Sequence, residues 1–175
     1  MSLWTGPFVL AACLLVVAGI AKAVQPASTA GALAAMHLPH RRWMVRFGGS
    51  VEAALACAAL LTGNTALTVL VALSYVAFAG FVVAALRIGA PLATCGCFGK
   101  IDTPPHALHV VLDLLAASAA VGVALDGGAP ISRILADQPW NGAPFALLVL
   151  IGAFAAALAM SALPRTLAAA HGGRS

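Results

Sequence analysis

Long apolar stretches alternate along the chain with short segments that hold most of its charged, proline and glycine residues. A helix needs about 20 predominantly apolar residues to cross the hydrocarbon core of a bilayer, and the stretches have about this length. The sequence therefore predicts an all-α membrane helical bundle of about five transmembrane helices, a four-helix core followed by one C-terminal span. We expect a single membrane domain over 1–175, with spans at about 7–24, 46–62, 65–87, 106–125 and 143–163 and a loop at 88–105.

The composition supports this fold class. Apolar residues make up 62% of the chain and charged residues 8%, whereas a soluble domain carries about 25% charged residues. This excludes an ordinary soluble enzyme and a nucleic-acid-binding protein, and makes the lipid bilayer the expected surroundings. Barrel strands would be about half as long and would alternate in polarity. Because no basic residue precedes Lys22, we expect 7–24 to remain as the first span and not to be a cleaved signal.

The basic residues predict the orientation, because cytoplasmic loops of membrane proteins are enriched in lysine and arginine. With five spans and the N-terminus outside, eight basic residues lie at the cytoplasmic side: Lys22, Arg41, Arg42, Arg46, Arg87, Lys100, Arg165 and Arg174. Only Arg133 lies outside. We therefore expect a plasma (inner) membrane protein with its N-terminus outside and its C-terminus in the cytoplasm.

The run Cys95-Gly96-Cys97-Phe98-Gly99 carries the clearest chemical signal. Gly96 lets the backbone bend, so the two thiols can close a small ring whose strain favours an exchangeable disulfide. Two other interpretations stay open. The cysteines can be small buried residues in a glycine-rich turn, or soft ligands for copper or zinc together with His106 or His109.

This run, together with Ala18–Lys22 at the end of the first span and Glu52 in the second, resembles the MauE/DoxX group of redox-associated membrane proteins, and MauE more closely. The resemblance covers about residues 7–125. It implies a multi-pass helical protein in thiol–disulfide redox transfer, linked to methylamine utilisation. It further implies maturation of a disulfide-containing partner alongside a thioredoxin-like protein.

Five ionisable residues are expected at a similar depth beside the cysteine pair: Lys22, Glu52, His106, His109 and Asp113. His109 and Asp113 lie one helical turn apart. A nearby histidine or lysine favours the thiolate, and Asp113 would orient the imidazole. The alternative roles are structural. Lys22 reaches the interface, Glu52 pairs with Lys22 or with Arg46, and His106 begins a helix in water.

The leading hypothesis is a membrane thiol–disulfide oxidoreductase with Cys95, Cys97, His109 and Asp113 in catalytic roles. Gly96, Phe98, Gly99, Lys22, Glu52 and His106 would line the site. The electron partner would be a quinone or a thioredoxin-like protein. The competing hypotheses are a metal-handling protein and a non-catalytic assembly factor.

A second thiol pair is conceivable. Cys13 and Cys57 are expected at similar depth in adjacent antiparallel spans, where they either pair or serve only as packed apolar side chains.

Overall fold

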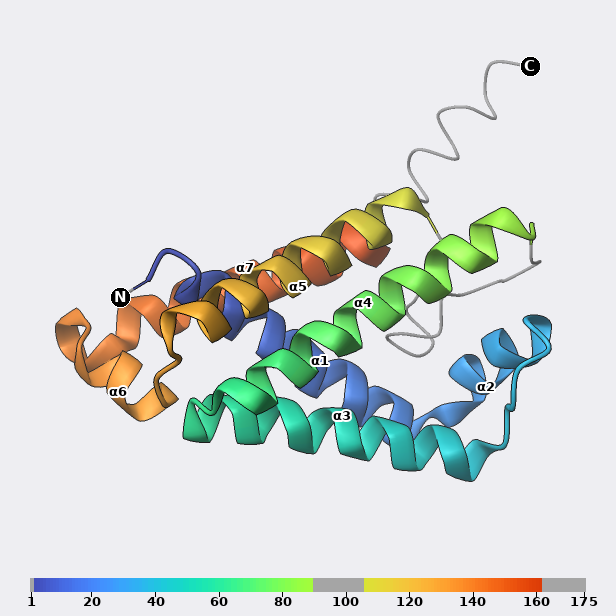
Figure 1. The fold of residues 1–175 in the computed structure, drawn as a ribbon, viewed down its shortest axis with the longest axis horizontal. Coiled ribbons are helices and arrows are strands. Elements are labelled where there is room, and N and C mark those ends of the chain that lie inside the picture. Colours follow the sequence, from blue (N-terminus) through green and yellow to red (C-terminus); the bar gives the residue numbers. More distant parts are fainter. Residues whose placement is uncertain (1, 90–105, 162–175) are drawn as a thin grey trace, which may run out of the picture.

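The protein is a bundle of long helices (Figure 1). The computed structural model describes residues 2–89 and 106–161. The helices are α1 (Thr5–Val24), α2 (Pro26–Ala35), α3 (Arg42–Thr62), α4 (Thr65–Arg87), α5 (Ala107–Asp126), α6 (Ile131–Ala136), the short 3-10 helix η2 (Pro139–Gly142) and α7 (Ala143–Ser161). Five helical segments are long and apolar enough to cross a membrane. The prediction of an all-α bundle with five spans is confirmed.

The long helices run up and down, each antiparallel to the one before it in the chain (Figure 1). α1 packs along α3 and α4 packs along α5, while contacts between α3 and α4 and between α1 and α5 join the two pairs. α7 packs against α1 outside this four-helix core, and only 6% of its span is buried. Lipid must therefore cover most of the surface of α7.

Small residues let the core helices approach one another. Ala12, Ala56, Ala59 and Ala120 are completely buried where the helices meet. In membranes, helix association depends on close packing because lipid tails are as apolar as the side chains. Large apolar side chains instead point outward, for example Phe47 and Leu70, which fits a surface surrounded by hydrocarbon.

The closest backbone approach joins α1 and α3 at Gly19 and Gly49. A Cβ atom on Gly19 would lie 2.5 Å from the Gly49 carbonyl oxygen, and one on Gly49 would lie 2.6 Å from the Gly19 carbonyl oxygen. Real Cβ contacts are never this short, so the crossing requires glycine on both helices. Lys22 and Glu52 follow these glycines by three residues each, and the crossing therefore sets the distance between their side chains.

A two-residue turn, Gly63-Asn64, joins α3 to α4. Gly63 ends α3 in the left-handed conformation, with φ of 63°, and its Cα faces Ala129 and Pro130 at a distance that leaves no room for a side chain. Asn64 then begins α4, because its side-chain oxygen accepts hydrogen bonds from the backbone N–H groups of Ala66 and Leu67. Gly63 thus caps the end of α3 and Asn64 caps the beginning of α4. Because the two caps are adjacent residues, the chain can reverse direction within two residues.

The two ends of the bundle differ in charge. The end of α1, the beginning of α3 and the end of α4 lie toward the same end of the bundle in Figure 1, and they carry Lys22, Arg42, Arg46 and Arg87. The opposite end holds the N-terminus, the Gly63-Asn64 turn and α6 with Arg133. α5 begins at the basic end, so the ends that flank residues 90–105 both lie there.

Candidate functional site

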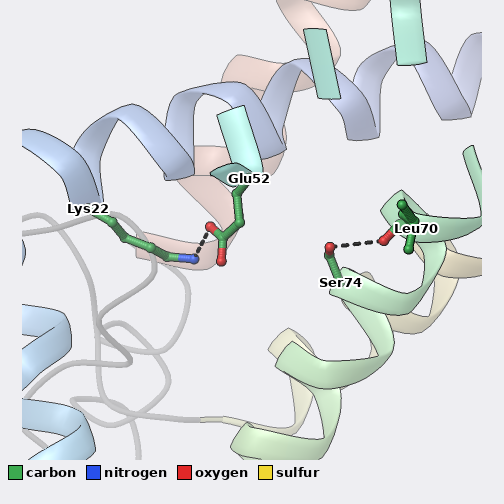
Figure 2. Close-up of polar contacts among 4 residues, drawn as sticks. All are labelled: Lys22, Glu52, Leu70 and Ser74. Carbon is green, nitrogen blue, oxygen red and sulfur yellow. Dashed lines mark hydrogen bonds and ion pairs between the residues drawn. The ribbon is translucent and has the colours of Figure 1, made fainter. Parts of the chain in front are cut away.

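An ion pair joins α1 to α3 near the basic end of the bundle. The Lys22 Nζ atom lies 2.6 Å from the Glu52 Oε2 atom, as Figure 2 shows. The Lys22 side chain is 7% exposed and that of Glu52 21%. A charge of either sign inside a membrane bundle needs a partner of opposite charge. Lys22 and Glu52 are such partners for each other. The pairing that the sequence suggested is therefore present.

Lys22 also contacts the other half of the core. Its ammonium lies 4.1 Å from the centre of the Phe78 ring on α4, within the range of a cation–π interaction. It is also close enough to the Asp113 carboxyl on α5 to interact with it electrostatically. One cation thus links residues of α1, α3, α4 and α5.

Figure 2 also shows a polar contact that does not belong to this group. The Ser74 hydroxyl donates a hydrogen bond to the Leu70 carbonyl oxygen of its own helix, at 2.9 Å. Serine in an apolar helix satisfies its hydroxyl in this way. Ser118 does the same toward Leu114, at 2.8 Å. We therefore assign neither serine to the site.

His109 and Asp113 lie on the inner face of α5, one turn apart. His109 is 2% exposed and Asp113 7%. Two titratable side chains on one buried face are expensive in a membrane and are by default candidates for function. The expectation that they share a face is met by their common burial.

Both residues line a cavity of about 430 Å³ whose walls are formed by α1, α4, α5 and α7. Tyr75 and Phe78 of α4 line the same cavity, and their rings meet edge to face with centres 6.0 Å apart. The Tyr75 hydroxyl donates a 2.6 Å hydrogen bond to the Ala11 carbonyl oxygen. The sequence interpretation did not include Tyr75, Phe78 or the cavity. Tyr75 could have been found, because it is the one tyrosine of the chain and its mid-span hydroxyl needs a partner.

His106 lies outside this buried group. It is exposed at the beginning of α5, where its Nδ1 atom accepts a hydrogen bond from the Leu108 backbone N–H at 3.2 Å. The side chain therefore caps the helix. This placement matches the alternative of a helix start in water.

Cys13 and Cys57 are free thiols on α1 and α3. Cys13 packs against the apolar core, and Cys57 is exposed on the outer face of α3.

The run Cys95-Gly96-Cys97-Phe98-Gly99 falls outside the described residues. The copper or zinc alternative names Cys95 and Cys97 beside His109, so two of its three ligands lie in that run. Within 2–89 and 106–161, no group of three or more His, Cys, Asp or Glu side chains is placed to hold a metal ion.

Comparison with known protein families tests the resemblance that the sequence analysis described. The family model described as methylamine utilisation protein MauE matches residues 1–126. The chain belongs to the MauE family. The MauE match includes the cysteine run, the ion pair and the His109–Asp113 pair, and it ends at the last residue of α5. No curated protein and no solved structure matches the chain.

Proposed function

We propose that this MauE-family protein is a membrane thiol–disulfide redox protein in which Cys95 and Cys97 alternate between a dithiol and a disulfide. The supporting observation is the gathering of Lys22, Glu52, His109 and Asp113 in the basic half of the bundle. Such side chains are costly inside a membrane. The helix ends that flank the cysteine segment lie at the same end of the molecule. This gathering of titratable side chains supports the proposal, because a thiol that loses its proton needs a proton acceptor nearby.

The reaction requires proton transfer as well as electron transfer. Forming one disulfide from two thiols releases two electrons and two protons. Either of two acceptors can take both: a quinone, which becomes a hydroquinone, or a thioredoxin-like partner, whose own disulfide becomes a dithiol through a mixed disulfide. Because the thiolate is the attacking species, His109 would accept a thiol proton, and Asp113, one turn away, would orient the imidazole.

Lys22 and Glu52 serve this proposal as positioning residues. Their ion pair holds α1 and α3 together beside Phe78 and keeps a cation near Asp113. By family membership we further propose a role in methylamine utilisation, through maturation of a disulfide-containing partner.

Counting accessible thiols tests the redox pair. The background is a Cys13→Ser/Cys57→Ser variant, because both of those thiols are free and would add label. Membranes are quenched with acid, with or without prior dithiothreitol, and labelled with a maleimide that adds mass per thiol. We expect two labels after reduction and none in the oxidised form. Cys95→Ser and Cys97→Ser should each give one label under both conditions.

Two labels without reduction, in the presence of any oxidised partner, would contradict an exchangeable pair. A variant that lacks both cysteines yet still supports maturation of the partner would favour the assembly-factor hypothesis. Copper or zinc that co-purifies with the parent and is lost from that variant would favour metal handling.

We also propose that the basic end of the bundle faces the cytoplasm, which brings the cysteine pair to that side. In the same background, a membrane-impermeant maleimide should label Cys95 and Cys97 only after lysis. Trp140→Cys, introduced into a cysteine-free chain, is the matched control. Trp140 is 85% exposed in η2, which contacts α6 at the opposite end, and it should be labelled in intact cells. The reverse pattern would place the pair on the outer side, where disulfides form in secreted proteins.

A further inference from the structure

The cavity between the core and α7 has an elongated form. Its wall on α1 extends from Gly6 to Ala18, a rise of about 18 Å at 1.5 Å per residue. On α7 its wall extends from Phe145 to Ala156. The cavity therefore follows the helix axes for more than half of the hydrocarbon core, which is about 30 Å thick.

The polar side chains of this wall are gathered toward one part of it. Tyr75, His109 and Asp113 are the lining residues that carry polar groups. His109 and Asp113 belong to the beginning of α5, at the basic end of the bundle. The opposite end, beside Gly6, Pro7 and Phe145, is apolar. An occupant that matches this wall has a compact polar head and a long apolar tail.

The cavity opens toward lipid. Leu115 of α5 and Leu148 of α7 both line it, yet they are 61% and 68% exposed. The opening therefore lies between these two membrane helices, and an occupant can enter sideways from the bilayer. A water-soluble ligand would have to cross hydrocarbon to reach it.

The charged groups near the His109–Asp113 end of the cavity restrict which kind of lipid headgroup fits there. The Asp113 carboxyl disfavours an anionic phosphate headgroup, and the Lys22 ammonium, which would favour one, is already paired with Glu52 at 2.6 Å. Histidine and a carboxyl group instead suit a neutral head that accepts and donates hydrogen bonds. The aromatic rings of Tyr75 and Phe78 supply apolar surface for a flat ring.

We propose that this cavity binds a lipid-soluble quinone, with the ring at the His109–Asp113 end and the isoprenoid chain between α1 and α7. The choice of a quinone among neutral lipids rests on the proposed function, which needs an acceptor for two electrons and two protons. The quinone would take both from the Cys95 and Cys97 thiols. Its two carbonyl oxygens become the hydroxyls of a hydroquinone as the disulfide forms.

Binding of decylubiquinone to the full chain in phosphatidylcholine nanodiscs tests the site without any enzyme assay. Tritiated decylubiquinone should bind the parent saturably. Ala156→Trp places a large ring in the cavity, and we expect it to weaken binding by about tenfold or more, about 1.4 kcal/mol. Ala155→Trp is the matched control, because Ala155 is exposed and does not line the cavity. Its affinity should stay within about twofold of the parent.

A second measurement does not depend on the folding of the tryptophan variants. Competition with 1-decanol, which has the tail without the ring, measures how strongly the ring is recognised. The parent should prefer decylubiquinone, and His109→Leu should reduce this preference. Equal competition by 1-decanol in the parent would show that the cavity holds only acyl chains and would overturn the proposal. So would the absence of saturable binding.

The thiol experiment and this one can fail separately. The Cys95→Ser/Cys97→Ser variant should bind decylubiquinone as the parent does, because described residues of α1, α4, α5 and α7 supply the wall that would hold the ring and the tail. Quinone binding together with a thiol pair that never oxidises would uphold the cavity assignment and refute the proposed function. A redox-active pair without quinone binding would refute this inference alone and leave a thioredoxin-like protein as the electron partner.

Discussion

Replacing Glu52 with glutamine is expected to destabilise the folded bundle by about 3 kcal/mol, near the lower limit for breaking a buried ion pair. The change leaves the Lys22 ammonium, which is 7% exposed, without the carboxylate that lies 2.6 Å away. The Phe78 ring and the Asp113 carboxyl still attract the cation, and for this reason we expect the lower limit. Denaturant titration of the purified protein in detergent, followed by circular dichroism, measures the loss.

The matched control removes both charges. A Lys22→Met/Glu52→Met variant has no unpaired ion, and replacement of a buried pair by apolar side chains of similar volume is often close to neutral. We expect the stability of this double variant to lie within about 1 kcal/mol of the parent and to be clearly greater than that of Glu52→Gln. If the single variant is as stable as the parent, Lys22 reaches water and the pair is not desolvated.

Replacing Gly49 with alanine is expected to cost about 1–3 kcal/mol, the usual range for overpacking. The added methyl would lie 2.6 Å from the Gly19 carbonyl oxygen and 2.8 Å from the Lys22 Cβ atom. The carbonyl oxygen belongs to the backbone and the Cβ atom is bonded to it, so neither can move aside alone. The helices α1 and α3 must therefore separate. The same denaturant titration measures the change.

Gly48 supplies the control for this prediction. It is the adjacent residue of α3, but a Cβ atom there meets nothing within 4 Å. Gly48→Ala should therefore be neutral or stabilising by up to about 1 kcal/mol, because alanine has the higher helix propensity. Gly19→Ala should lower the free energy of unfolding by a similar amount to Gly49→Ala, because its added methyl would meet the Gly49 backbone at the same helix crossing. Equal effects at Gly48 and Gly49 would refute the close crossing.

Hydropathy alone was enough to predict the helices that are long and apolar enough to span the membrane. A bilayer requires long apolar runs regardless of which helices pack together. The helices extend beyond the predicted spans at their beginnings: α3 begins at Arg42, before 46, and α1 at Thr5, before 7. Backbone hydrogen bonding continues a helix through polar residues such as arginine and threonine. An apolar window cannot detect those turns.

The ion pair was within reach of the sequence, whereas the cavity was not. Lys22 and Glu52 lie at matching depth in consecutive antiparallel spans, so their contact follows from topology. The cavity depends on which faces of α1, α4, α5 and α7 meet. Apart from a few polar residues these helices are apolar on every side, and the hydropathy pattern therefore does not predict which face of each helix meets its neighbours. The same limit applies to Gly48-Gly49, where the sequence shows two small residues and the structure shows that only Gly49 meets α1.

α7 lies beyond the stretch that matches the family, which ends with α5. Yet Phe145, Leu148, Val149 and Ala156 of α7 form one side of the cavity. The shape of the cavity thus depends in part on a helix outside the matched stretch. A chimaera that keeps 1–126 and exchanges the last helix should keep its thiols and charges while accepting tails of another length or bulk.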